Sequence, residues 1–261
     1  MKEHTVLYEK KENVGIIRFN RPSRLNAINH ALLEGFMAQL HAARRDPEVR
    51  SVILTGAGRS FCAGEDLKEA ASGDKTIEQW TKEVDALQDV QRVILGLGKP
   101  LIAAVNGYAV GGGLEFALSC DIRIAGKDAQ FGFPETSVGL TVTTAGTKLI
   151  TQIVGLGKAK ELILTGRFVD AREALEIGLI NKVVDNESLV DQAMEMCGAI
   201  NERSPLALKL SRIAIDRGMS AGFEQILELE ASHLLTCIHS NEQQARIDKK
   251  LTSMNTEKAN A

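Results

Sequence analysis

The chain has 261 residues and a mass of 28.3 kDa, with 44% hydrophobic and 25% charged residues and a formal net charge of −3. These values are close to those of ordinary globular domains and exclude a disordered, collagen-like or coiled-coil protein. The 31 Lys and Arg residues form no basic block long enough to bind a phosphate backbone, so nucleic acid is not an expected partner.

Cysteine, histidine and apolar residues are distributed as in a protein without disulfides, metal or membrane spans. The four cysteines lie far apart with no CxxC pair, and the first residues contain no apolar leader, so a reducing cytoplasm is the expected location. The five histidines have no ligand spacing, so no metal ion is expected. No apolar run approaches the about 18 residues of a membrane helix, so no membrane partner is expected.

The first half of the chain predicts alternating strands and helices. Residues 6–8 and 14–19 flank a polar segment and predict a hairpin. The spacing of apolar residues predicts one helix from about residue 26 to 45 and another over 77–95. The other expected elements are a strand at 51–55, a glycine-rich loop at 56–64, a strand at 101–106, a glycine turn at 107–113, a short helix carrying 114–118, a strand at 122–125 and an extended segment at 130–133.

After about residue 145 the pattern is almost entirely helical. Asp170 with Glu173 three residues later indicates a helix start, and residues 182–184 predict a short strand. Amphipathic helices expected at 188–200, 205–216 and 221–238 indicate core cover or subunit contacts. The polar tail 253–261 is expected to fray. The whole order indicates an α/β protein whose strands share one core.

The glycine turn lies between an expected strand and an expected helix. Gly111, Gly112 and Gly113 precede that helix, whose first N–H groups have no intrahelical partner and can bind negative oxygen. Taken alone, the run is more simply explained by close packing that tolerates only glycine. A nucleotide site is not supported, because Phe61 occupies the third glycine position after Gly56-Ala57-Gly58 and no P-loop lysine motif occurs.

Two carboxylates are candidates for acid and base chemistry. Glu115 falls in the first turn of the short apolar helix, and Glu135 follows Phe133-Pro134. An ionised carboxylate in an apolar segment costs stability, so such a placement favours a functional role. Taken singly, each also fits a structural role, Glu115 at the helix dipole and Glu135 in a solvated loop.

A second loop, residues 61–67, offers another backbone donor. Ala63-Gly64 allows a second N–H group to approach the first, and two such donors make an oxyanion hole. Cys62 has no histidine nearby in the sequence, so it is interpreted as a small buried residue and not as a nucleophile.

Six ordered motifs between about residues 5 and 240 resemble the enoyl-CoA hydratase/isomerase (crotonase) superfamily. They are Asn20-Arg21-Pro22 with Leu25-Asn26-Ala27, GRSFCAGEDL at 58–67, AVNGYAVGGGLE at 104–115, FGFPE at 131–135, LTGR at 164–167 and AREALEIGL at 171–179. The resemblance implies a spiral of ββα units over residues 1–195 that carries the active site. It also implies a helical oligomerisation region over residues 196–261, which builds trimers or dimers of trimers.

The resemblance also implies the ligand and the roles of site residues. The ligand is an acyl-coenzyme A thioester, whose oxygen the backbone N–H groups of Glu65 and Gly112 hold. In hydratases of this family two glutamates hold the water that adds across the α,β double bond, and Glu115 and Glu135 match them. Coenzyme A is part of the substrate, so no separate cofactor is expected. The expected coenzyme and substrate contacts are Ser23, Arg24, Leu25, Ala63, Leu67, Gly111 and Thr143.

The sequence departs from the family pattern in two places. Val142 and Thr143 replace the proline and the glycine usual in hydratases, so a β-branched hydroxyl residue is expected to crowd the acyl pocket or to form a hydrogen bond within it. The customary C-terminal ending is absent after residues 239–242, so its coenzyme contacts are not carried over.

Both glutamates together favour a 2-enoyl-CoA hydratase of fatty-acid metabolism that acts on a short or medium acyl chain. An enoyl-CoA isomerase is the nearest alternative, because one glutamate can shuttle a proton and Thr143 suits a differently placed water. A non-catalytic member of the superfamily that binds acyl-CoA or RNA is the alternative from another class.

Overall fold

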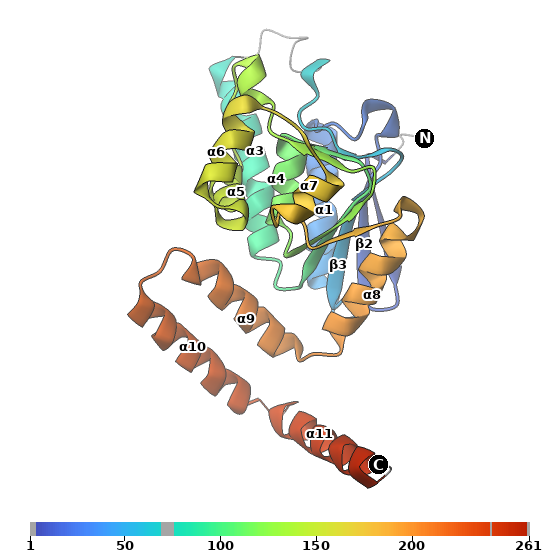
Figure 1. Ribbon diagram of the computed structural model, residues 1–261, viewed down its shortest axis with the longest axis vertical. Coiled ribbons are helices and arrows are strands. Elements are labelled where there is room, and N and C mark those ends of the chain that lie inside the picture. The colour runs from blue at the N-terminus through green and yellow to red at the C-terminus, as the bar shows by residue number, and fades with distance from the viewer. Residues whose placement is uncertain (1–3, 69–75, 241, 260–261) are drawn as a thin grey trace. The chain divides into compact units, whose positions relative to one another are not determined.

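The computed structural model describes residues 4–68, 76–240 and 242–259 (Figure 1). The chain divides into two compact units, Met1–Asn201 and Glu202–Ala261. The sequence analysis places this division after residue 195, which lies inside helix α8 (Leu189–Asn201). No helix in the described part of the chain is both long enough and apolar enough to cross a membrane.

The first unit contains a six-stranded sheet with the strand order β1-β2-β3-β5-β7-β10. Strands β1 and β2 form the predicted antiparallel hairpin, and the other neighbouring pairs are parallel. Strands β3 and β5 are buried at every residue, as expected for parallel strands covered on both faces. The strands are β1 (Val6–Lys11), β2 (Val14–Phe19), β3 (Ser51–Gly56), β5 (Leu101–Val105), β7 (Ile122–Gly126) and β10 (Lys182–Val184).

A smaller four-stranded sheet has the order β4-β6-β8-β9. It comprises β4 (Ser60–Cys62), β6 (Tyr108–Val110), β8 (Gln130–Gly132) and β9 (Val169–Asp170). Strands β3, β5 and β7 of the large sheet are each followed along the chain by β4, β6 and β8 of the small sheet. Helix α3 (Ile77–Leu95) follows the first of these strand pairs and α4 (Gly112–Ser119) the second. This repetition confirms the predicted ββα spiral.

The remaining helices of the first unit cover the sheets or follow the spiral. Helix α8 packs on one face of the large sheet, where Leu189, Ala193 and Cys197 join the buried cluster around Ile53 and Ile102. The others are α1 (His30–Arg45), α5 (Gly146–Val154), α6 (Leu156–Thr165), α7 (Ala171–Glu176) and three 3-10 helices, Pro22–Arg24, Glu135–Val138 and Asn186–Ser188.

The main core lies on the opposite face of the large sheet. Phe19 of β2, Phe36 of α1, Phe61 of β4 and Phe116 of α4 have ring centroids 5.0–6.1 Å apart and are fully buried. Edge-to-face packing of this kind stabilises more than buried area alone. These rings connect the hairpin, the small sheet and the two helices that lead to the candidate site.

Helix α1 begins at His30 and not near residue 26 as predicted. Asn26 adopts a left-handed conformation, with φ of 56°, and its buried side chain donates to the carbonyls of Ala57 and Ser60 at 2.9 and 2.7 Å. These long-range bonds hold Asn26 outside the helix. Asn29 is the N-cap, because its side chain accepts from the Leu32 amide.

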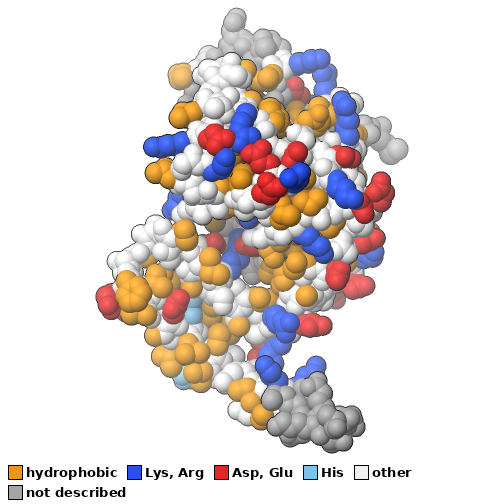
Figure 2. Space-filling model, in the orientation of Figure 1, with side chains coloured by type: hydrophobic (Ala, Val, Ile, Leu, Met, Phe, Trp, Pro, Cys, Tyr) orange, Lys and Arg blue, Asp and Glu red, His pale blue; other side chains and the backbone are white. Residues whose placement is uncertain are grey.

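The second unit contains three helices, α9 (Pro205–Gly218), α10 (Phe223–Ile238) and α11 (Glu242–Ala259). Helix α11 is not predicted by the apolar spacing, because most of its described side chains are polar. Pairs such as Glu242–Arg246 and Gln244–Asp248 join residues four apart along it. None of the residues of α10 is buried, and hydrophobic side chains gather on the surface of this unit in Figure 2.

Candidate active site

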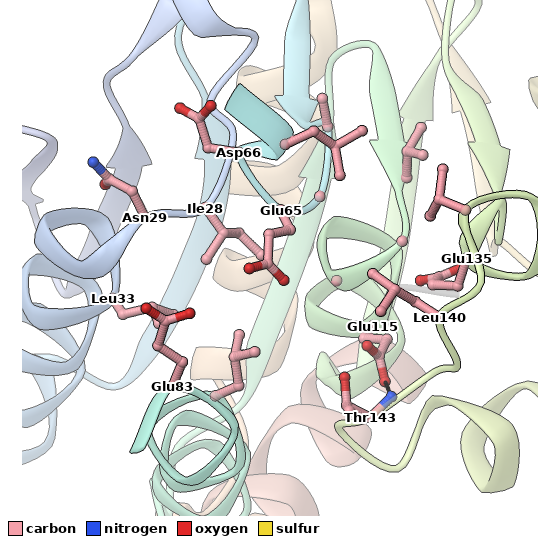
Figure 3. Close-up of a pocket in the computed structure, with 18 of the residues that line it drawn as sticks. Ile28, Asn29, Leu33, Glu65, Asp66, Glu83, Glu115, Glu135, Leu140 and Thr143 are labelled. Atoms are coloured by element: carbon pink, nitrogen blue, oxygen red, sulfur yellow. Dashed lines mark hydrogen bonds between the residues drawn. The ribbon is translucent and has the colours of Figure 1, made fainter. Parts of the chain in front are cut away.

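A cavity of about 500 Å³ lies in the first unit, where the spiral brings several loops together (Figure 3). Its lining includes the loop after β4, the junction of β6 and α4, and the 3-10 helix Glu135–Val138 with the loop that follows it. The start of α1 and one side of α3 complete the wall. Of the predicted site residues, the lining includes Ala63, Glu65, Leu67, Gly111, Gly112, Glu115, Glu135 and Thr143.

The amide of Glu65 is directed by a short parallel pairing with Ile28. The Gly64 carbonyl accepts from the Ile28 amide at 2.7 Å, and the Asp66 amide donates to the Ile28 carbonyl at 2.9 Å. Because backbone groups alternate in direction along an extended segment, the N–H of Glu65 points away from Ile28. Gly64 allows this turn, since its φ is +83° and an added Cβ would lie 2.8 Å from the Val110 carbonyl oxygen.

The amide of Gly112 lies at the first position of helix α4. An N–H at this position has no acceptor within its own helix, and none of the described residues accepts from it. Gly111 precedes it with φ of 54° and ψ of −128°, a conformation that only glycine adopts readily. Gly113 has a structural reason to be glycine, because a Cβ there would lie 2.1 Å from the Cys62 carbonyl oxygen. Close packing therefore explains Gly113, whereas binding of a negative oxygen by the Gly112 N–H stays a prediction.

Glu115 is held in place by backbone donors. Only 2% of its surface is exposed. Its Oε1 accepts from the amides of Thr143, Thr144 and Gly146 at 3.2, 2.6 and 3.1 Å. Burial raises the pKa of this carboxyl, and the three amides oppose that shift by stabilising the ionised form. Because all three amides bind Oε1, Oε2 remains for a water or a substrate atom.

Glu135 has a different environment in the same cavity. Its Oε2 is buried and has no hydrogen-bond partner among the described residues. The pKa of Glu135 is raised to about 7, chiefly by burial and to a lesser extent by the nearby Glu115 charge, against the opposing effect of its own amide. An added Cβ at Gly111 would lie 2.9 Å from Glu135 Oε1, so the glycine junction also makes room for this carboxyl. The two glutamates thus differ in their surroundings, since amides bind one oxygen of Glu115 whereas a buried oxygen of Glu135 has no partner among the described residues.

Comparisons with known proteins agree with this arrangement. The family model described as enoyl-CoA hydratase/isomerase matches residues 9–260. The chain belongs to the enoyl-CoA hydratase/isomerase family. It is 40% identical over 253 residues to the short-chain-enoyl-CoA hydratase of Clostridium acetobutylicum, covering 93% of both chains. It is 38% identical over 245 residues to the crotonyl-CoA hydratase of Syntrophomonas wolfei, again covering 93% of both.

Solved structures in this family have the same fold. The crystal structure of an enoyl-CoA hydratase from Bacillus anthracis matches with a TM-score of 0.91 and 34% identity, over 95% of this chain and 96% of that one. The crotonase-like architecture expected from the sequence motifs is therefore confirmed over most of the chain.

Three residues expected from the family resemblance do not line the cavity. Ser23 and Arg24 are exposed in the 3-10 helix Pro22–Arg24, and Leu25 follows in a left-handed conformation. The segment is nevertheless close to the site, because the Leu25 carbonyl accepts from the Ala63 amide at 3.1 Å. Leu67, at the end of the loop 61–67 that contains Ala63, is 55% exposed. Their contacts with coenzyme A remain a prediction.

The sequence analysis missed most of the cavity wall. Residues of α1 and α3, among them Leu33, Ala86 and Leu87, line the cavity, although their apolar spacing is typical of ordinary core helices. Only the tertiary arrangement distinguishes a cavity wall from a filled core. Cys62 agrees with its predicted role, because it is buried and burial raises its thiol pKa to about 12, so the reactive thiolate is disfavoured.

Proposed function

We propose that this protein adds water across the α,β double bond of a 2-enoyl-CoA thioester with a short or medium acyl chain. The observation that carries this proposal is the pair of glutamates in one cavity, Glu115 held by three amides and Glu135 with a raised pKa. The relatives named as short-chain-enoyl-CoA and crotonyl-CoA hydratases support the same reaction.

In the proposed mechanism, the amides of Glu65 and Gly112 donate to the thioester oxygen. Two such donors stabilise the negative charge that develops there when a nucleophile attacks the β-carbon. These two backbone donors thereby polarise the thioester.

The two glutamates then divide the proton transfers. Ionised Glu115 takes a proton from the water as its oxygen forms a bond to the β-carbon, and the π electrons of the double bond move toward the thioester oxygen. Protonated Glu135 delivers its proton to the α-carbon as the carbonyl reforms. Return of the proton from Glu115 to Glu135 restores the starting state. The different environments of the two carboxyls suit these opposite roles.

A substrate panel tests the proposal. The purified protein is incubated with 2-enoyl-CoA thioesters of increasing length and with a 3-enoyl-CoA of matched length, and loss of the conjugated double bond and formation of a 3-hydroxyacyl product are measured. Hydration of the 2-enoyl compounds is the expected result. Conversion of the 3-enoyl compound to the 2-enoyl compound without hydration would instead indicate an isomerase. Binding of the thioesters without turnover would indicate a non-catalytic protein.

The proposal extends to assembly and to cellular role. Exposed apolar residues on α10, including Phe223 and Leu234, support a trimer or a dimer of trimers. The activities named for the relatives support a role in fatty-acid metabolism, which we place in the cytoplasm.

A further inference from the structure

The backbone amide and the side chain of Thr143 have different surroundings in the cavity. Its amide donates to Glu115 Oε1 at 3.2 Å, so the backbone at this position already holds the glutamate. Its side chain lines the cavity and is half-buried. Figure 3 shows the side-chain oxygen of Thr143 directed into the space beside the Glu115 carboxylate. The hydroxyl is therefore the polar group that this side chain can offer to a ligand.

The Thr143 hydroxyl differs from two other hydroxyls nearby, those of Ser137 and Thr136. Ser137 donates to the Pro134 carbonyl at 2.6 Å, and Thr136 donates to the Ile163 carbonyl at 3.3 Å. In the part of the chain that the structure describes, the Thr143 hydroxyl makes no hydrogen bond. A hydroxyl can donate and accept, and it rotates to suit its partner. It is thus a hydroxyl that is both directed into the cavity and available to a ligand.

We propose that the Thr143 hydroxyl binds the oxygen that is added at the β-carbon. Before the reaction that oxygen belongs to the water between the glutamates, and afterwards it is the 3-hydroxyl of the product. The hydroxyl accepts a hydrogen bond from one O–H of the water while Glu115 Oε2 accepts one from the other O–H, which fixes the orientation of the attacking lone pair. After addition, the same hydroxyl binds the new 3-hydroxyl group. This inference rests on the proposed hydratase function and assigns one more polar contact to the same site.

Three substitutions separate the hydroxyl from the shape of the side chain. Thr143→Val keeps the β-branched shape and removes the hydroxyl, Thr143→Ser keeps the hydroxyl and removes the methyl, and Thr143→Ala removes both. All three retain the amide that binds Glu115. Thr151→Val is the matched control, since the Thr151 hydroxyl bonds the Thr147 carbonyl within α5 and does not line the cavity.

We expect kcat to fall in the variants that lack the hydroxyl at position 143 and to be largely retained in the variant that keeps it. Hydrogen bonds of this kind contribute about 0.5–1.5 kcal/mol, so Thr143→Val and Thr143→Ala should lower kcat for crotonyl-CoA by roughly 3- to 10-fold. Their KM should change little, because the enoyl substrate lacks the oxygen concerned. Thr143→Ser should recover most of the lost rate. If Thr143→Val matches wild type, or if Thr143→Ser loses as much as Thr143→Val, the proposal is wrong.

Binding of the product and of an analogue that lacks its 3-hydroxyl provides a second readout, measured in a Glu135→Gln background in which the proposed mechanism cannot turn the product over. 3-Hydroxybutyryl-CoA and butyryl-CoA differ in the 3-hydroxyl, and calorimetry measures the affinity of each. Thr143→Val should weaken the first by about 3- to 10-fold and leave the second unchanged. Equal effects on both ligands, or on neither, would overturn the proposal.

The same experiments distinguish failure of this inference from failure of the proposed function. A wild-type protein that hydrates crotonyl-CoA, with variants indistinguishable from it, contradicts only the role of the Thr143 hydroxyl. A wild-type protein that neither binds nor hydrates these thioesters contradicts the proposed function and this inference with it. Thermal melts of every variant verify that the fold is retained.

Discussion

The two glutamates of the cavity differ in the groups that surround them. Three amides hold one oxygen of Glu115, whereas Glu135 has a buried oxygen without a partner among the described residues. The sequence identified both residues, because carboxylates beside apolar segments are unusual. It could not show their environments, since the amides of residues 143–146 reach Glu115 only through the folded loop.

If the two glutamates act on one water, their effects on the rate are not additive. Glu115→Gln and Glu135→Gln should each lower kcat for hydration by about 10²–10⁴. The kcat of the double variant should be only slightly lower than that of the less active single variant. When two groups act as a unit, removal of either one already abolishes their joint contribution. Measured kcat values for the three variants test this, and losses that multiply would contradict a shared water.

The rate should also depend on pH through Glu135. Burial raises the pKa of Glu135 to about 7, and the proposed mechanism uses its protonated form. The kcat/KM for hydration should therefore fall by about tenfold per pH unit above about 7, because kcat/KM follows the ionisation of the free enzyme. A kcat/KM that is flat between pH 7 and pH 9 would show that Glu135 does not act as the acid.

The raised pKa of Glu135 also makes the stability of the protein depend on pH. The direction of this dependence is opposite to that produced by a carboxyl in a salt bridge, whose pKa is lowered. A carboxyl whose pKa rises on folding contributes stability that is fully present below its unfolded value of 4.5 and is lost as the pH rises through about 7. Glu135→Gln should thus raise Tm relative to wild type at pH 8 and have little effect at pH 4.5. Calorimetric melts at the two pH values provide this check independently of substrate.

Elements with strong local signals were predicted closely. Helix α3 has its expected bounds, because its apolar spacing coincides with a capping box in which Thr76 accepts from the Gln79 amide. Asp170 caps α7 as predicted, although Glu173 binds Arg167 and does not complete a capping box. Strand β9 is only two residues long and carries no local signal. Where long-range bonds decide an element, as at Asn26, local spacing is insufficient.

The start of α4 yields a test of the oxyanion hole. Gly112→Pro removes the proposed N–H donor at a first-turn position, where proline is tolerated best. Loss of one such donor typically lowers kcat by about 10²–10³. Gly112→Ala is the control, because it keeps the N–H and its Cβ would meet only the tip of Ile28, at 2.9 Å.

Stability measurements separate this effect from simple misfolding. Gly113→Ala is the structural contrast, since its Cβ would lie 2.1 Å from a backbone oxygen, and it should lower Tm. Gly112→Pro should retain a Tm close to that of wild type. A Gly112→Pro variant with a normal melt and a kcat within about threefold of wild type would refute the oxyanion assignment.

At the scale of the whole molecule, the exposed apolar residues of the second unit predict self-association. Phe223 is 78% exposed and Leu234 62%. A trimer has a mass of about 85 kDa, three times the 28.3 kDa of one chain. Light scattering at micromolar concentration should give this mass or twice it, and a mass of 28.3 kDa would contradict the proposal.

Substitutions on α10 test whether this helix forms the self-association surface. The pair Phe223→Asp and Leu234→Asp should shift the mass toward that of the monomer, because a buried unpaired charge is costly at an interface. Ile77→Asp in α3 is the control, since Ile77 is 84% exposed in the first unit. An unchanged mass in the α10 variants would exclude this helix as the main contact.

The donors proposed for the thioester oxygen belong to the main chain, and this has a consequence for how the protein can evolve. Every residue except proline supplies an N–H at position 65, so mutational drift of that side chain leaves the donor in place. The proton-transfer groups, in contrast, are the side chains at positions 115 and 135. A descendant could therefore acquire different acid–base chemistry by exchanging these two residues while it keeps the inherited means of activating a thioester.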